Sequence, residues 1–195
     1  MSPQPNRQFS PEAPPASAAE YSPQERRQLL NLAHAAIVAA LESRELDTTP
    51  PSDHLGERRG AFTTLHVDGH LRGCVGYVFP AYSLYRTIAE TAQAAAFRDA
   101  RFPPVTAEEA PRLRIEISVL SPLAPISPDE IEIGRHGLVV TYGSRRGLLL
   151  PQVPAEHGWD REAFLEQACL KAGLPPDAWR HGALIEAFTA EVFGE

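Results

Sequence analysis

The residues with the clearest chemical potential lie in the run Leu71–Gly76, where a cysteine stands between two glycines. In a strand, residues two positions apart point to the same face, so Arg72 and Cys74 are expected to project together. A guanidinium beside a thiol favours the thiolate, which is the reactive form of cysteine. Gly73 and Gly76 would let a ligand or another chain approach the backbone, and Gly76 would leave this face bare. The run predicts a site, although a small buried cysteine in a sheet would fit equally well.

A carboxylate joins this candidate site from a second predicted strand, residues 112–120. Its apolar and polar residues alternate, and Glu116 falls on the polar face. If the two strands were neighbours, Arg72 and Glu116 would come within ion-pair range. The simpler interpretation is a salt bridge on a half-exposed sheet. The alternative is a cleft that holds thiol, guanidinium and carboxylate, in which Cys74 would act as a nucleophile or a redox thiol.

Two further side chains are weaker candidates for binding. His136 lies between an arginine and a glycine and could act as a ligand or a base. Gln152 lies in the proline-bounded run 150–154, which is either a rigid turn or a loop that presents an amide donor and acceptor. The histidines and the two cysteines show no recognised zinc or iron spacing, so no metal is predicted. The sequence identifies no cofactor, because it contains neither a phosphate-binding loop nor a dinucleotide fingerprint.

Composition narrows the class of protein. The chain has 195 residues with a formal net charge of −7, which argues against a nucleic-acid binder because such proteins need clustered positive charge. No apolar run approaches the length that crosses a bilayer, and the N-terminus lacks a signal-peptide pattern. Two cysteines are too few for a disulfide framework. We therefore expect a cytoplasmic protein with free thiols and no membrane partner.

The order of predicted elements indicates the fold class. Residues 1–20 are rich in proline and are expected to form a disordered tail before a domain at 21–195. The expected elements that follow are a helix from Pro23 with Ser22 as its cap, a hairpin 61–67/71–78 turning at Asp68-Gly69, a helix 83–97, a strand 112–120, a connector 126–132, a hairpin 138–142/146–150, a helix from Asp160 to about Ala172, a short helix after Pro175, and a closing strand 185–193. This mixture of hairpins and helices predicts an α+β fold with antiparallel sheet flanked by helices.

Several ordered segments together resemble one family. The run Leu71–Gly76 is similar to the Leu-Arg-Gly-Cys-Ile/Val-Gly signature of the AMMECR1 family, also called AmmeMemoRadiSam system protein A. The similarity extends over residues 22–193 and includes the segments 61–67, 95–104, 115–121, 136–138, 150–153 and 171–174. Val75, where isoleucine is common, is a conservative departure. The resemblance implies two lobes, a larger one on an antiparallel sheet and a smaller one packed on it.

The resemblance also carries expectations about function. It implies a bacterial or archaeal cytoplasmic protein associated with a Memo-like protein, which resembles class III extradiol dioxygenases, and with a radical SAM protein. One hypothesis is a component that binds a small molecule or a partner through a cleft on the Leu71–Gly76 motif, with Gly73, Gly76, His136 and Gln152 as binding residues. It would carry substrate, act as a scaffold or present the strand to another chain. The alternative is an enzyme that uses Cys74 as an activated thiol with Arg72 and Glu116.

Overall fold

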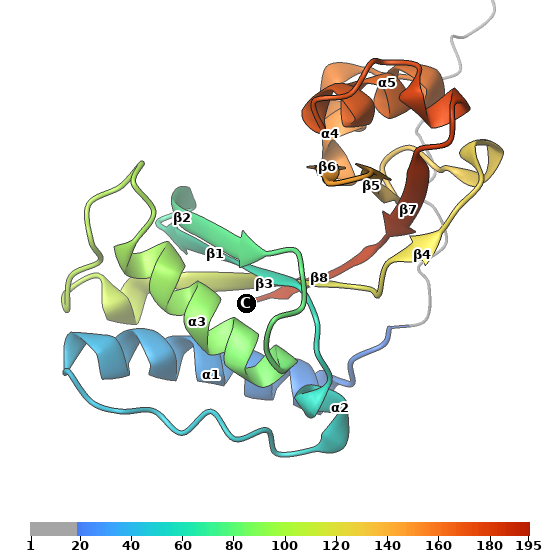
Figure 1. The fold of residues 1–195 in the computed structure, drawn as a ribbon. Coiled ribbons are helices and arrows are strands. Elements are labelled where there is room, and N and C mark those ends of the chain that lie inside the picture. The colour runs from blue at the N-terminus through green and yellow to red at the C-terminus, as the bar shows by residue number, and fades with distance from the viewer. Residues whose placement is uncertain (1–18) are drawn as a thin grey trace, which may run out of the picture.

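The computed structural model of the chain describes residues 19–195. Within this range the chain folds into two lobes, each built on a four-stranded antiparallel sheet (Figure 1). The α-helices are α1 (Pro23–Leu41), α2 (Asp53–Gly56), α3 (Leu84–Phe97), α4 (Gln152–His157) and α5 (Arg161–Lys171). The strands are β1 (Ala61–Val67), β2 (His70–Tyr77), β3 (Arg114–Leu120), β4 (Ala124–Pro125), β5 (Gly137–Tyr142), β6 (Arg145–Leu149), β7 (Leu184–Phe188) and β8 (Ala190–Gly194). Short 3₁₀ turns occupy Ala110–Arg112, Pro128–Glu130 and Ala178–Arg180. The α+β prediction is confirmed, whereas the predicted tail falls almost entirely outside the described residues.

The larger lobe packs α1 and α3 on one face of a sheet with the strand order β2-β1-β3-β8 (Figure 1). The start of α1 is specified locally, because Ser22 and Glu25 form a reciprocal capping box and Pro23 takes the first helical position. The core between helices and sheet contains Leu29, Ile37, Ile88, Leu65, Ile115 and Ile117, all fully buried. The predicted helix starts and the predicted alternation of β3 are therefore confirmed.

The β1–β2 hairpin turns where the sequence predicts it. Asp68 and Gly69 both adopt positive φ angles, of 51° and 79°, which a type I′ turn requires. A register irregularity between Leu65 and His66 adds one residue near the turn. Beyond it, Thr64 lies opposite Cys74 and Phe62 lies opposite Gly76. The hairpin therefore fixes which side chains of β1 accompany the cysteine.

The smaller lobe contains a sheet with the order β4-β7-β5-β6, and α5 packs on one face of it. Asp160 caps α5 and Gly173 follows its end with a φ of 70°, as the sequence predicts. The connector after β3 includes the two residues of β4, and Pro175-Pro176 leads into a 3₁₀ turn. The run 150–154 differs from the prediction, because α4 begins at Gln152 instead of a loop.

The last part of the chain joins the two sheets. The sequence predicts one continuous closing strand over 185–193, and this prediction is wrong because the segment forms two strands. The chain forms β7 in the smaller lobe and, after Thr189, β8 in the larger lobe, which follow one another along a single diagonal line (Figure 1). A run of alternating residues shows that a segment is extended, but it cannot show that the segment changes sheets.

A small apolar cluster links the lobes. Leu120 at the end of β3, Val139 of β5 and Phe188 of β7 are buried together, and Phe62 packs against them. At the edge of the junction, the Arg146 guanidinium lies 4.3 Å from the ring centroid of Phe79, which places a cation on an aromatic face. The smaller lobe therefore covers the Phe62 end of the first sheet on the face opposite α1 and α3.

Candidate functional site

The candidate site lies on the face of the first sheet that α1 and α3 do not cover, which we call the open face. Cys74 of β2 lies opposite Thr64 of β1, and Thr64 lies opposite Glu116 of β3. The three residues therefore form one row across three strands. Because neighbouring strands are about 4.8 Å apart, the Cα atoms of Cys74 and Glu116 lie about 10 Å from each other. The row places Cys74 and Glu116 on the same face of the sheet, with Thr64 between them, a residue to which the sequence assigned no role.

Thr64 connects directly to the thiol. Its hydroxyl Oγ1 donates a hydrogen bond to Cys74 Sγ over 3.3 Å. The thiol is half-buried, whereas the other cysteine, Cys169, is fully buried in α5. An O–H donor of this kind stabilises negative charge on sulfur more than it stabilises the neutral thiol. The sequence of residues 61–67 could have identified Thr64, because Thr64 and His66 are polar and stand two positions apart, which puts both on one face of a strand.

Asp99 and Arg101, from the loop after α3, occupy the outer edge of β2 at Cys74. The Cys74 amide donates to Asp99 Oδ2 over 2.9 Å, and Arg101 Nη2 approaches the Cys74 carbonyl oxygen at 3.4 Å. The same guanidinium donates to both Asp99 oxygens, at 3.0 and 2.7 Å. Both outward peptide groups of Cys74 are thus paired with side chains, so this edge is not open for another strand.

The electrostatics of this pair follow from the same contacts. The Arg101 hydrogen bond, followed by the Cys74 amide, holds the pKa of Asp99 well below its ordinary value. Asp99 in turn raises the pKa of Arg101, with a further contribution from the nearby Cys74. Arg101 is therefore a cation close to the thiol. Both residues fall in the segment 95–104 that carries the family resemblance, but the sequence predicts no role for Asp99 or Arg101 in the site.

Arg72 does not pair with Glu116, and that prediction is wrong because β1 lies between β2 and β3. Instead, Arg72 Nε donates to Glu109 Oε1 over 2.8 Å, and Nη2 donates to Oε2 over 3.1 Å. Its remaining donors reach the carbonyl oxygens of Pro103 and Pro104. The Arg72 hydrogen bonds, together with the Thr106 amide, lower the pKa of Glu109 to about 2. The hydrogen bonds of Arg72 therefore link β2 to the segment that precedes β3.

Gly73 and Gly76 are each closely covered by another part of the fold. A Cβ atom at Gly73 would lie 2.1 Å from the carbonyl oxygen of Ala95, so this glycine permits the close approach of α3. A Cβ atom at Gly76 would lie 2.1 Å from Cδ1 of Phe62, whose ring covers the position. The expectation of a bare surface at Gly76 is wrong, because a cross-strand aromatic side chain fills it.

His136 and Gln152 lie in the smaller lobe. His136 precedes β5 and its Nδ1 accepts a hydrogen bond from the Glu132 amide over 3.0 Å, while burial lowers its pKa. Gln152 begins α4 with an exposed side chain. Among residues 19–195, no hydrogen bond or ion pair joins either side chain to the row of Thr64, Cys74 and Glu116.

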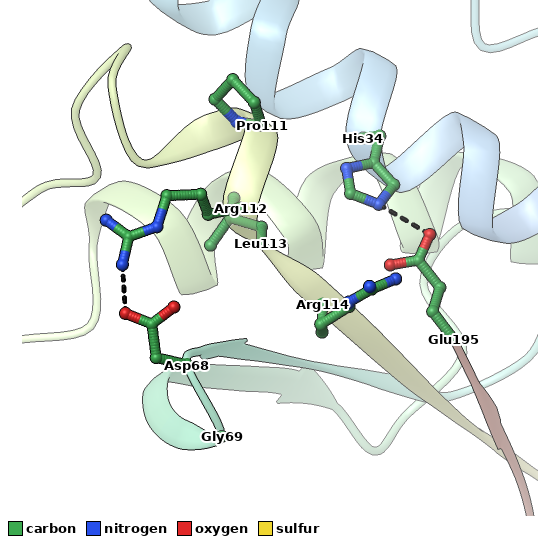
Figure 2. Close-up of a pocket in the computed structure, with 8 residues that line it drawn as sticks. All are labelled: His34, Asp68, Gly69, Pro111, Arg112, Leu113, Arg114 and Glu195. Carbon is green, nitrogen blue, oxygen red and sulfur yellow. Dashed lines mark hydrogen bonds and ion pairs between the residues drawn. The ribbon is translucent and has the colours of Figure 1, made fainter.

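Residues 19–195 contain no group of three or more histidine, cysteine, aspartate or glutamate side chains that could hold a metal ion. None of the helices formed by these residues has the length and apolar character needed to cross a membrane. One hollow of about 590 Å³ lies beside Pro50, Ser52 and Glu57, and another, of about 540 Å³, lies at the end of β8 (Figure 2).

The fold and the site define a two-lobed α+β protein with a cysteine-bearing open sheet face. The AMMECR1 family model matches residues 30–193, and the chain belongs to the AMMECR1 family. Protein MK0488 of Methanopyrus kandleri is 47% identical over 179 residues, covering 86% of each chain. Protein MJ0810 of Methanocaldococcus jannaschii is 44% identical over 173 residues, covering 84% of this chain and 86% of the relative. The crystal structure of the uncharacterised protein PH0010 from Pyrococcus horikoshii matches with a TM-score of 0.70 and 42% identity, covering 86% of this chain and 90% of that one.

Proposed function

We propose that this AMMECR1-family protein is a binding component that acts with a Memo-like protein and a radical SAM protein. It would hold a small molecule or a partner segment on the open face around the Leu71–Gly76 motif. The observation that supports this proposal best is the row of thiol, hydroxyl and carboxylate formed by Cys74, Thr64 and Glu116. The association with the two partners rests on the family resemblance alone.

The chemistry of the row suits a small polar ligand. The Glu116 carboxylate is exposed, the Thr64 hydroxyl oxygen can accept a hydrogen bond while its proton is donated to Sγ, and the Arg101 guanidinium lies at the Cys74 end. A rigid sheet holds these groups in fixed positions, which reduces the ordering cost of binding. The partner would rest on the face and would not add a strand, because side chains already pair the edge of β2 at Cys74.

The test is affinity purification of the tagged chain from its native host at near-native expression. We expect the two partners, or a ligand detected by native mass spectrometry, to be recovered with the wild-type protein. Recovery should fall in Glu116→Gln and remain unchanged in Glu45→Gln, a control on an exposed loop position. Turnover by the isolated protein, with neither partner nor ligand retained, would contradict the proposal.

The enzymatic alternative is a reaction that uses Cys74 as an activated thiol with Glu116. The specific observation in its favour is the Thr64 hydrogen bond to Sγ, with Arg101 close by. The role first assigned to Arg72 would pass to Arg101, because Glu109 engages Arg72.

Iodoacetamide labelling tests the alternative, since the thiolate displaces iodide and forms the S–C bond. Labelling at pH 7 should be faster than for free cysteine and should slow in Arg101→Gln. It should change little in Arg72→Gln, and mass spectrometry would locate the label on Cys74 instead of the buried Cys169. A rate equal to that of free cysteine would remove the support for an activated thiol.

A further inference from the structure

We infer that the hollow at the end of β8 is a binding site for a small organic carboxylate, and that the side chain of Glu195 occupies its donors in this structure. The hollow has a volume of about 540 Å³, which falls in the range of small-molecule sites. It is lined by His34, Asp68, Gly69, Pro111, Arg112, Leu113, Arg114 and Glu195 (Figure 2). None of its lining residues belongs to the row of Cys74, Thr64 and Glu116, and the inference does not depend on the proposed function.

Donors from two separate elements converge on the Glu195 carboxylate. His34 Nε2, from α1, lies 3.0 Å from Oε1, and the Ile115 amide of β3 donates to Oε2 over 3.3 Å. Figure 2 shows the imidazole of His34 and the side chain of Arg114 on either side of this carboxylate. One oxygen thus meets an imidazole and the other a backbone N–H, which is an arrangement suited to any carboxylate.

The hollow lies beside the start of β3, where the Glu195 amide donates to the Ile115 carbonyl oxygen over 3.3 Å. β8 ends at Gly194, opposite Glu116, whereas β3 begins two residues earlier at Arg114. Arg114 therefore pairs with His66 of β1 on one side and borders the hollow. Its guanidinium is exposed and forms no ion pair within residues 19–195, so a cation is available beside the two donors.

The carboxylate of Asp68, which also lines the hollow, does not offset the positive charge of Arg114. Asp68 is engaged by Arg112, and the pair brings no net charge to the hollow (Figure 2). A free carboxylate that replaced Glu195 could keep the His34 and Ile115 contacts and add the Arg114 guanidinium. Glu195 would then turn toward solvent. The tethered Glu195 carboxylate competes at a high effective concentration, so it sets the ligand concentration at which the site fills.

The probe is glutarate, titrated into the full chain and followed by the backbone amide of Ile115 in ¹H–¹⁵N spectra. We expect weak binding to the wild type and about tenfold tighter binding to Glu195→Ala, because the internal competitor is removed. Glu195→Gln should fall between the two, since its amide oxygen still accepts from Ile115 without the charge. Adding Arg114→Gln to Glu195→Ala should reverse the gain.

The controls are Glu132→Ala and Arg135→Gln, an exposed ion pair of the smaller lobe, which should leave glutarate binding unchanged. Dispersed spectra report that each variant is folded. The inference is overturned if Glu195→Ala and Glu195→Gln both bind glutarate no more tightly than the wild type. It is also overturned if Arg114→Gln has no effect, or if sodium chloride at equal ionic strength reproduces the shifts.

Discussion

The guanidinium of Arg72 and the carboxylate of Glu109 form a doubly hydrogen-bonded ion pair, with 2.8 Å between Nε and Oε1 and 3.1 Å between Nη2 and Oε2. Both side chains are largely buried, with exposed fractions of 12% and 26%. The pair joins β2 to the segment that leads into β3. It explains why the arginine of the Leu71–Gly76 motif is a structural residue in this fold.

A double-mutant cycle distinguishes this pair from the one predicted from the sequence. We expect Arg72→Gln and Glu109→Gln to couple by about 1–2 kcal/mol in the free energy of unfolding, because each variant breaks the same bidentate contact. The cycle of Arg72→Gln with Glu116→Gln should give a coupling near zero. Urea unfolding measures both, and equal coupling in the two cycles would contradict the observed strand order.

The same carboxylate predicts how stability depends on pH. The pKa of Glu109 is lowered from 4.5 to about 2, so its ionised form is favoured by folding. Its contribution is fully present above pH 4.5 and is lost as the pH falls toward 2. The difference in unfolding free energy between wild type and Glu109→Gln should therefore shrink over this window. A difference that stays constant from pH 6 downward would show that the carboxylate does not titrate as described.

Gly73 is predicted to be intolerant of a side chain. Because its Cβ would meet the Ala95 carbonyl oxygen at 2.1 Å, Gly73→Ala must push α3 away from β2. We expect a loss of about 1–3 kcal/mol in unfolding free energy, which is typical of overpacking. Gly56→Ala is the matched control, since its nearest neighbour is at 3.7 Å. Similar stabilities for the two variants would mean that the helix approaches β2 less closely.

Asp99 is predicted to protect the edge of β2. Asp99→Ala leaves the Cys74 amide without its acceptor and should cost about 1–3 kcal/mol. It also exposes the edge, so size-exclusion chromatography with light scattering should detect self-association. Asp99→Asn keeps an acceptor oxygen and should lose less, while Asp129→Ala, at an exposed position, should change neither property. A monomeric Asp99→Ala protein with wild-type stability would contradict this role.

The local features of the fold could be predicted because they depend on neighbouring residues. The Ser22 capping box, the Asp68-Gly69 turn and the Asp160 cap are each specified within four residues of chain. The same holds for the alternation that puts Glu116 on a polar face. The switch of the last strand from one sheet to the other, and the helix that begins at Gln152, depend on packing between distant segments.

By itself, the sequence determined the two hairpins, the alternating faces of β3 and the presence of Cys74 in a strand of the first hairpin, because a period of two is a local property of extended chain. Only the tertiary structure decided that β1 separates Arg72 from Glu116, that Thr64 stands between Cys74 and Glu116, and that Asp99 and Arg101 close the edge. It also decided that α3 and Phe62 fill the space beside Gly73 and Gly76. Strand order is a choice among long-range pairings that bury similar faces, and that choice is not encoded in the spacing of residues along one strand.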